Sequence, residues 1–337
     1  MKKQSNISVF MRRNREIVIA WCVLIVVLLL YSFFMKDFWS KYGPQSICNQ
    51  VVTLSIVAFG QLVVVMTGGI DLSVGPMVAL CNCIFATILA PVIEFVGGSI
   101  LPGVILAGLV AMACGALVGV LNATIVVFGR IQPIVVTLST SMICSGAALL
   151  VRPEPGGDVT RTFCKFMTGR AFDIIPVSFI IILIMVFCVW KPFRRTGIGQ
   201  GLLAIGGNEY SAYTSGIKIN KTKFMAYVIC GIMAGLAAIV LTASTASGDA
   251  TGSANYTINS IAAVVLGGAS LMGGRGSYVG SVAGAMILSL ILGLLIFWGV
   301  SSWYQNAAQG GILLVALSIG ALRTFLAKKA ACHELKA

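Results

Sequence analysis

Charge is scarce in this sequence. Only 10% of the 337 residues are charged, whereas 58% are hydrophobic and the mean hydropathy is +0.99. A soluble domain typically carries about 25% charged residues, so a soluble globule of this composition would have to expose a largely apolar surface. Disordered chains are excluded as well, because they are poor in apolar residues and rich in charge. The class that remains is an all-α membrane protein with several transmembrane helices.

Histidine is almost absent, and nucleotide-binding motifs are missing. The single histidine, His333, lies near the end of the sequence, which excludes a His-dependent triad or a His-rich metal site in the apolar part. No Gly-Lys pair occurs, so the sequence has no P-loop for ATP. The ten cysteines lie mostly in apolar runs, where they behave as small hydrophobic residues. We therefore expect no catalytic site, cofactor or metal ion on this chain.

Apolar runs long enough to cross a membrane recur along the chain. A transmembrane helix needs about 20 mostly apolar residues, and residues 1–337 are expected to form one transmembrane domain. The run at residues 257–270 is short and has Asn259 and Ser260 near its start, so we expect a broken or partly re-entrant helix there. The ten predicted spans are residues 17–34, 47–66, 76–96, 101–128, 133–151, 174–190, 224–245, 257–270, 277–300 and 305–322.

Basic residues indicate the orientation. Ten spans put both termini on one side, and 17 of the 23 Lys and Arg residues fall on that side. Cytoplasmic segments carry such an excess of positive charge, so we predict cytoplasmic termini. This asymmetry also explains the net charge of +13 without nucleic acid. Two segments between spans are long: residues 152–173 are predicted to form an irregular external loop, and residues 191–223 a basic cytoplasmic loop.

The cytoplasmic loop contains the signals of one short helix. Asn208 or Ser211 can cap a helix of about two turns, and Gly216 can end it. A helix of that length is not stable alone and needs a surface to pack on. With Tyr210 and Tyr213 among small residues, it would suit docking into a groove of another protein. A simple turn at the membrane surface is the alternative.

A second informative segment is TGGIDLSVGP at residues 67–76. Two glycines end one predicted span, and Asp71 or Ser73 can cap the next helix, whose first turn tolerates Pro76. An acidic residue near the membrane is costly and is a candidate for function. Asp71 is therefore interpreted as a helix cap, as a transport or gating residue, or as a contact for a cytoplasmic partner.

The polar residues inside the predicted spans are mostly neutral. Acidic and histidine side chains form no relay across the spans, so proton coupling lacks the necessary groups. Neutral hydrogen-bonding side chains suit a polar, uncharged solute such as a sugar, although each can instead bond a neighbouring helix. The candidates for translocation or gating are Asp71, Ser73, Gln61, Asn122, Thr137 and Ser141.

A third segment, at residues 267–277, is rich in glycine and contains Arg275. At an offset of 205 residues, Gly68 and Gly69 align with Gly273 and Gly274, and Val-Gly and Ser-Ile pairs align at the same offset. Duplicated bundles are common in transporters, so these matches indicate an internal repeat as one interpretation of the sequence.

The three segments together resemble one family. GGIDLSVG at residues 68–75, AIGGN through SGI at residues 204–217, and IAAVVLGG through GGRG at residues 261–276 occur in the same order as in the permeases of bacterial ABC importers for ribose, xylose, galactosides and autoinducer-2. The resemblance covers roughly residues 45–325 and implies an ABC type II-like importer permease in the bacterial inner membrane.

The resemblance also implies partners and roles. It implies a second permease copy or sister permease, an ABC ATPase subunit with two nucleotide-binding cassettes that holds ATP and Mg, and a periplasmic or lipid-anchored sugar-binding protein. It identifies the short helix as the coupling helix, and the residues implied to contact the ATPase are Asn208, Glu209, Tyr210, Ser211, Ala212, Tyr213, Ser215 and Gly216. Import of nucleosides or branched-chain amino acids by a related permease, or transport without ATP, are the alternatives; a membrane enzyme is the weakest.

Overall fold

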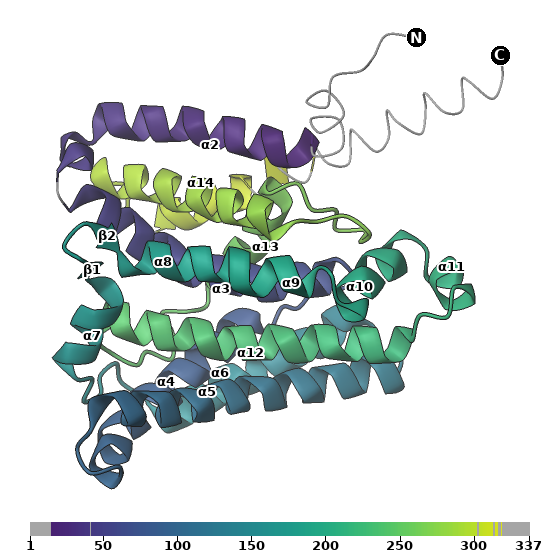
Figure 1. Ribbon diagram of the computed structural model, residues 1–337, viewed down its shortest axis with the longest axis horizontal. Coiled ribbons are helices and arrows are strands. Elements are labelled where there is room, and N and C mark those ends of the chain that lie inside the picture. The colour runs from purple at the N-terminus through teal and green to yellow at the C-terminus, as the bar shows by residue number, and fades with distance from the viewer. Residues whose placement is uncertain (1–14, 41, 302, 313, 316–317, 319–337) are drawn as a thin grey trace.

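The computed structural model describes residues 15–40, 42–301, 303–312, 314–315 and 318. They form a bundle of long helices, and α11 extends beyond one end of it (Figure 1). The first half contains α2 (Arg15–Phe34), η1 (Lys36–Trp39), α3 (Gly43–Val65), α4 (Val74–Phe95), α5 (Ile100–Ala123), η2 (Thr124–Phe128) and α6 (Pro133–Val151). The second half contains α7 (Arg161–Thr168), β1 (Arg170–Ala171), β2 (Ile175–Pro176), α8 (Val177–Ile184), η3 (Met185–Trp190), α9 (Lys191–Phe193), α10 (Gly197–Gly207), α11 (Glu209–Thr214), α12 (Ile219–Thr245), α13 (Tyr256–Leu266) and α14 (Tyr278–Phe297).

Helices α3 and α12 form the core of the bundle. Every residue from Val51 to Val65 of α3 is buried, and α12 packs against α3, α4 and α5. Gly115 of α5 and Gly231 of α12 let these two backbones touch, because a Cβ atom at either glycine would overlap with the carbonyl group of the other. Helix α2 is mostly exposed, which suits contact with lipid at the edge of the bundle.

The all-α prediction is confirmed, but the structure does not confirm ten spans. Seven described helices are long and apolar enough to cross a membrane, or eight if Val177–Phe193 and Gly197–Gly207, bent by 76°, form one span. The predicted span 257–270 is the 11-residue helix α13. Such a helix is about 16 Å long, roughly half the hydrocarbon thickness, in keeping with a broken span. Of the predicted span 305–322, residues 305–312, 314–315 and 318 are described and are helical. Its other residues, like residues 1–14 and 323–337, lie outside the described residues.

The structure corrects the prediction for residues 152–173. Its second half is ordered rather than irregular, with helix α7 followed by strand β1, which pairs with β2 in an antiparallel hairpin. Phe163 of α7 is buried against Phe85 of α4, with 5.6 Å between the ring centroids. This aromatic contact across 78 positions of sequence is not visible from local patterns. It gives α7 the packing surface that a helix of this length needs.

The segment 191–223 is mostly helical. The chain turns after α9, and Thr196 caps α10 by accepting a hydrogen bond from the Gly199 N–H at 3.1 Å. Helix α11 follows, and α12 begins at Ile219, earlier than the predicted residue 224. We refer to the end of the bundle where α3 and α5 end and α4, α6 and α12 begin as the α11 end.

Candidate functional site

Helix α11 is built as its local sequence predicts. The Asn208 side chain accepts a hydrogen bond from the Ser211 N–H at 2.9 Å, which caps the first turn. Gly216 lies at φ +81°, and its N–H donates to the Tyr213 carbonyl at 2.9 Å, which closes the last turn. Ala212 is buried against the rest of the chain. The predicted cap and the predicted end of this helix are therefore both confirmed.

The outer face of α11 carries two exposed aromatic rings. Tyr210 is 77% exposed and Tyr213 69% exposed, on a helix that projects from the bundle (Figure 1). On the inner side, Glu209 forms an ion pair with Lys223 of α12, with 2.7 Å between Oε2 and Nζ. Aromatic rings on a protruding helix provide large contact area for a partner. The ion pair ties the start of α11 to the bundle.

The three segments singled out in the sequence meet at the base of α11. Gly206, at the end of α10, packs so closely against the Met66 carbonyl and the Gly273–Gly274 backbone that a Cβ atom there would overlap with both. The Gly274 N–H donates to the same Met66 carbonyl at 3.1 Å. We call this contact the glycine junction. The sequence aligned Gly68 with Gly273 as repeats, but it did not predict that the two turns pack together and against α10.

A buried polar cluster lies in the turn between α3 and α4. Asp71 is fully buried, and its Oδ1 accepts hydrogen bonds from the Ser73 N–H at 2.8 Å and the Ser73 hydroxyl at 2.6 Å. The Asn122 side chain of α5 donates to the Ser73 hydroxyl at 2.9 Å. The capping interpretation is thus partly confirmed: Asp71 fixes the turn before α4, whereas the Ser73 side chain makes no capping bond to the helix.

Two further candidates join this cluster. The Gln61 side chain, oriented with its nitrogen toward the Asp71 carbonyl, donates to it at 3.0 Å and accepts from the Asp71 N–H at 3.3 Å. Thr137 of α6 lies near the Ile70 carbonyl, at 3.5 Å. Ser141, one turn further along α6, makes no hydrogen bond to the cluster within the described part of the chain. Five of the six candidates therefore converge, and their roles in transport stay predictions.

Burial leaves unsatisfied polar atoms in the cluster. Oδ2 of Asp71 and Oδ1 of Asn122 have no hydrogen-bond partner among the described residues. Asp71 belongs to the connection between two spans, and burial raises the pKa of its carboxyl group, while the hydrogen bonds from Ser73 act in the opposite direction. Cys230 of α12 lies close to this carboxyl group. No local pattern in the sequence connects Cys230 with Asp71.

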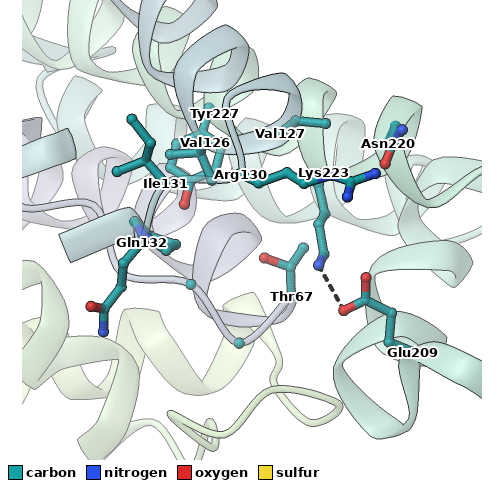
Figure 2. Close-up of a pocket in the computed structure, with 13 residues that line it drawn as sticks. Thr67, Val126, Val127, Arg130, Ile131, Gln132, Glu209, Asn220, Lys223 and Tyr227 are labelled. Carbon is teal, nitrogen blue, oxygen red and sulfur yellow. Dashed lines mark hydrogen bonds and ion pairs between the residues drawn. The ribbon is translucent and has the colours of Figure 1, made fainter. Parts of the chain in front are cut away.

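An open cleft of about 670 Å³ lies beside the cluster at the α11 end (Figure 2). It is lined by the turn at residues 67–69, the connection between α5 and α6, and the starts of α11 and α12. Tyr227 of α12 also lines it, and a Cβ atom at Gly69 would lie 2.9 Å from the Tyr227 hydroxyl. Tyr227 was missed in the sequence, because a single tyrosine in an apolar run is typical of a packed core residue.

Comparison with known proteins identifies the family. A family model described as branched-chain amino acid transport system, permease component, matches residues 43–317. The chain belongs to this family of transport permeases. The matched residues include those of α11, the glycine junction and the Asp71 cluster.

Individual permeases agree with this assignment. The ribose import permease protein RbsC of Escherichia coli strain K12 is 33% identical over 303 residues, which cover 88% of this chain and 91% of that protein. RbsC of Bacillus subtilis strain 168 is 33% identical, covering 87% of this chain and 89% of its own. The autoinducer 2 import system permease protein LsrD of Escherichia coli O9:H4 is 30% identical, covering 80% and 81%. No solved structure matches the chain.

Two substitutions at Asp71 separate its structural role from its charge. Asp71→Ala removes both hydrogen bonds to Ser73 and leaves a buried N–H unpaired, which costs about 1–3 kcal/mol of unfolding free energy. Asp71→Asn keeps the accepting oxygen and should preserve the thermal unfolding midpoint of the purified permease, while uptake falls. Unfolding scans and solute uptake in cells measure the two effects. Wild-type uptake by Asp71→Asn would show that Asp71 acts only as a structural cap.

Proposed function

We propose that this permease is the membrane subunit of an ATP-driven ABC importer that moves a monosaccharide, or a similar small polar neutral solute, by alternating access. The observation that carries the proposal is the glycine junction. It joins a projecting helix with exposed tyrosines to the turn that contains the buried Asp71 cluster. A partner that moves α11 would thereby move the turn between α3 and α4. The chain itself is a transport subunit and not an enzyme.

The names of the relatives support a sugar as solute. The ribose permeases match nearly the whole chain, and the autoinducer 2 permease matches most of it. The neutral groups of Gln61, Asn122 and Thr137 agree with an uncharged polar solute. The description of the family model favours a second candidate, a branched-chain amino acid. A nucleoside is a third solute class that the same mechanism would serve.

The proposed assembly is the one that the resemblance to ABC importer permeases implies. ATP and Mg would be held by an ATPase subunit with two nucleotide-binding cassettes docked on α11. A second permease copy or sister permease would complete the solute path, and a periplasmic or lipid-anchored binding protein would supply selectivity. Most Lys and Arg residues of the described part lie at the α11 end, among them Arg130, Arg194, Arg195 and Lys223. This excess of positive charge supports placing the α11 end on the cytoplasmic side of the bacterial inner membrane.

Energy-dependent uptake tests this function. Cells that express the permease with its neighbouring transport genes are given radiolabelled ribose, and a strain without the permease gene is the control. We expect uptake that stops when ATP is depleted and persists when an uncoupler collapses the proton gradient in cells whose ATP is maintained. Competition by unlabelled leucine or adenosine, but not by sugars, would support the other solute classes. Uptake that survives ATP depletion and fails with the uncoupler would contradict an ABC importer.

A further inference from the structure

The cleft at the α11 end combines groups that suit an anion. Arg130, from the connection between α5 and α6, and Lys223 of α12 both line it, and Figure 2 shows both side chains extending into the same space. Within the described part of the chain, Arg130 has no carboxylate partner, whereas Lys223 is paired with Glu209. Thr67 and Asn220 add neutral donors to the lining. The titratable side chains of the lining thus consist of two cations, one carboxylate and Tyr227.

A buried hydroxyl points independently to a missing ligand. Tyr227 is 2% exposed, lines the cleft beside Gly69, and its hydroxyl has no hydrogen-bond partner among the described residues. Buried polar groups are nearly always paired, and an exception calls for an explanation. Because this hydroxyl has almost no accessible surface and lies against Gly69, it would donate to a ligand in the inner part of the cleft only after the turn at Gly69 shifts. The volume of about 670 Å³ exceeds what a single water or a small ion fills.

We propose that this cleft binds a small molecule that carries a phosphate group, with Arg130 as its main anchor, and that the phosphate competes with Glu209 for Lys223. Guanidinium groups bind phosphate oxygens in a bidentate manner, and ammonium groups bind them as point charges. When Lys223 turns to the phosphate, the ion pair that ties α11 to α12 opens. Binding would thereby loosen the helix that we propose as the ATPase contact. This regulatory consequence rests on the proposed function, but the binding itself does not.

The phosphate can come from a soluble metabolite or from a lipid headgroup, and the experiment separates the two. The full-length permease is placed in phosphatidylcholine nanodiscs and titrated by calorimetry with ribose 5-phosphate, inorganic phosphate and ribose. We expect saturable binding of ribose 5-phosphate, weaker binding of phosphate and none of ribose. In nanodiscs that contain phosphatidylglycerol, unchanged binding identifies a soluble ligand, whereas loss of binding identifies the headgroup as the occupant.

Four variants test whether each side chain changes the affinity for ribose 5-phosphate in the expected direction. Arg130→Gln should weaken binding of ribose 5-phosphate by about tenfold or more, because it removes a charge-assisted contact. Tyr227→Phe should weaken it by a few-fold, through loss of one hydrogen bond. Glu209→Gln should tighten it, because Lys223 is released from its ion pair. Arg195→Gln, an exposed cation at the same end but outside the cleft, should leave it unchanged.

Several results would overturn the proposal. They are the absence of saturable binding by ribose 5-phosphate in both kinds of nanodisc, equal binding of ribose and ribose 5-phosphate, and weakening by Arg195→Gln as large as that by Arg130→Gln. Weakened binding in Glu209→Gln would also contradict competition for Lys223. None of these measurements involves an ATPase or transport, so the proposed function can fail while the phosphate site stands, and the reverse.

Discussion

Gly206→Ala is expected to abolish ATP-driven uptake. The added Cβ atom would overlap with the Met66 carbonyl and with the Gly273–Gly274 backbone, and neither is a flexible side-chain end that can move away. The glycine junction would have to open, and α11 would lose its connection to the turn that holds Asp71. Overpacking of this kind typically costs about 1–3 kcal/mol, enough to displace a short helix without unfolding the bundle. Radiolabelled uptake and the thermal unfolding midpoint measure the two effects.

The neighbouring glycine provides the control for this variant. A Cβ atom at Gly207 would meet nothing within 4 Å, so Gly207→Ala should retain wild-type uptake and stability. The two substitutions add the same methyl group one residue apart at the end of α10. Equal uptake by Gly206→Ala and Gly207→Ala would show that the junction does not transmit movement.

The double variant Tyr210→Ala, Tyr213→Ala is expected to lose the ATPase subunit during purification. Both rings are exposed on the projecting face of α11, and neither supports the packing of the helix on the bundle. Truncation of an interface tyrosine that acts as a hot spot costs about 2 kcal/mol or more, a factor of about 30 in affinity. Affinity purification of the tagged permease, with the ATPase quantified by mass spectrometry, measures the loss.

An exposed tyrosine outside α11 serves as the matched control. Tyr304 is 72% exposed and follows α14, away from the α11 end. Tyr304→Ala should retain the ATPase, and all variants should insert into the membrane in wild-type amounts. Full recovery of the ATPase with the double variant would show that α11 is not the docking helix.

Local chemistry explains why α11 could be predicted. Its cap at Asn208 and its end at Gly216 depend on side-chain and backbone preferences within a few residues. The same holds for the turn at Asp71, where the acceptor and the donor are two residues apart. The number of spans was less predictable, because the ends of apolar runs do not show where α8 to α10 bend or how short α13 is.

Long-range contacts explain what the sequence left out. The glycine junction joins residues near positions 66, 206 and 274, and each glycine alone has many ordinary roles. Likewise, Tyr227 and Cys230 approach the Asp71 segment only because α12 packs against α3, α4 and α5. Such contacts depend on the path of the whole chain, whereas periodicity and capping signals report on single elements.

Reconstitution tests the central claim most directly. The purified permease is placed in proteoliposomes alone, or together with its co-purified ATPase and binding protein, and the movement of radiolabelled ribose is followed with and without ATP and Mg on the side of the ATPase. We predict that ribose moves only when the ATPase, the binding protein and ATP are all present. Saturable ribose transport by the permease alone would contradict a subunit that depends on a partner at α11 for its energy.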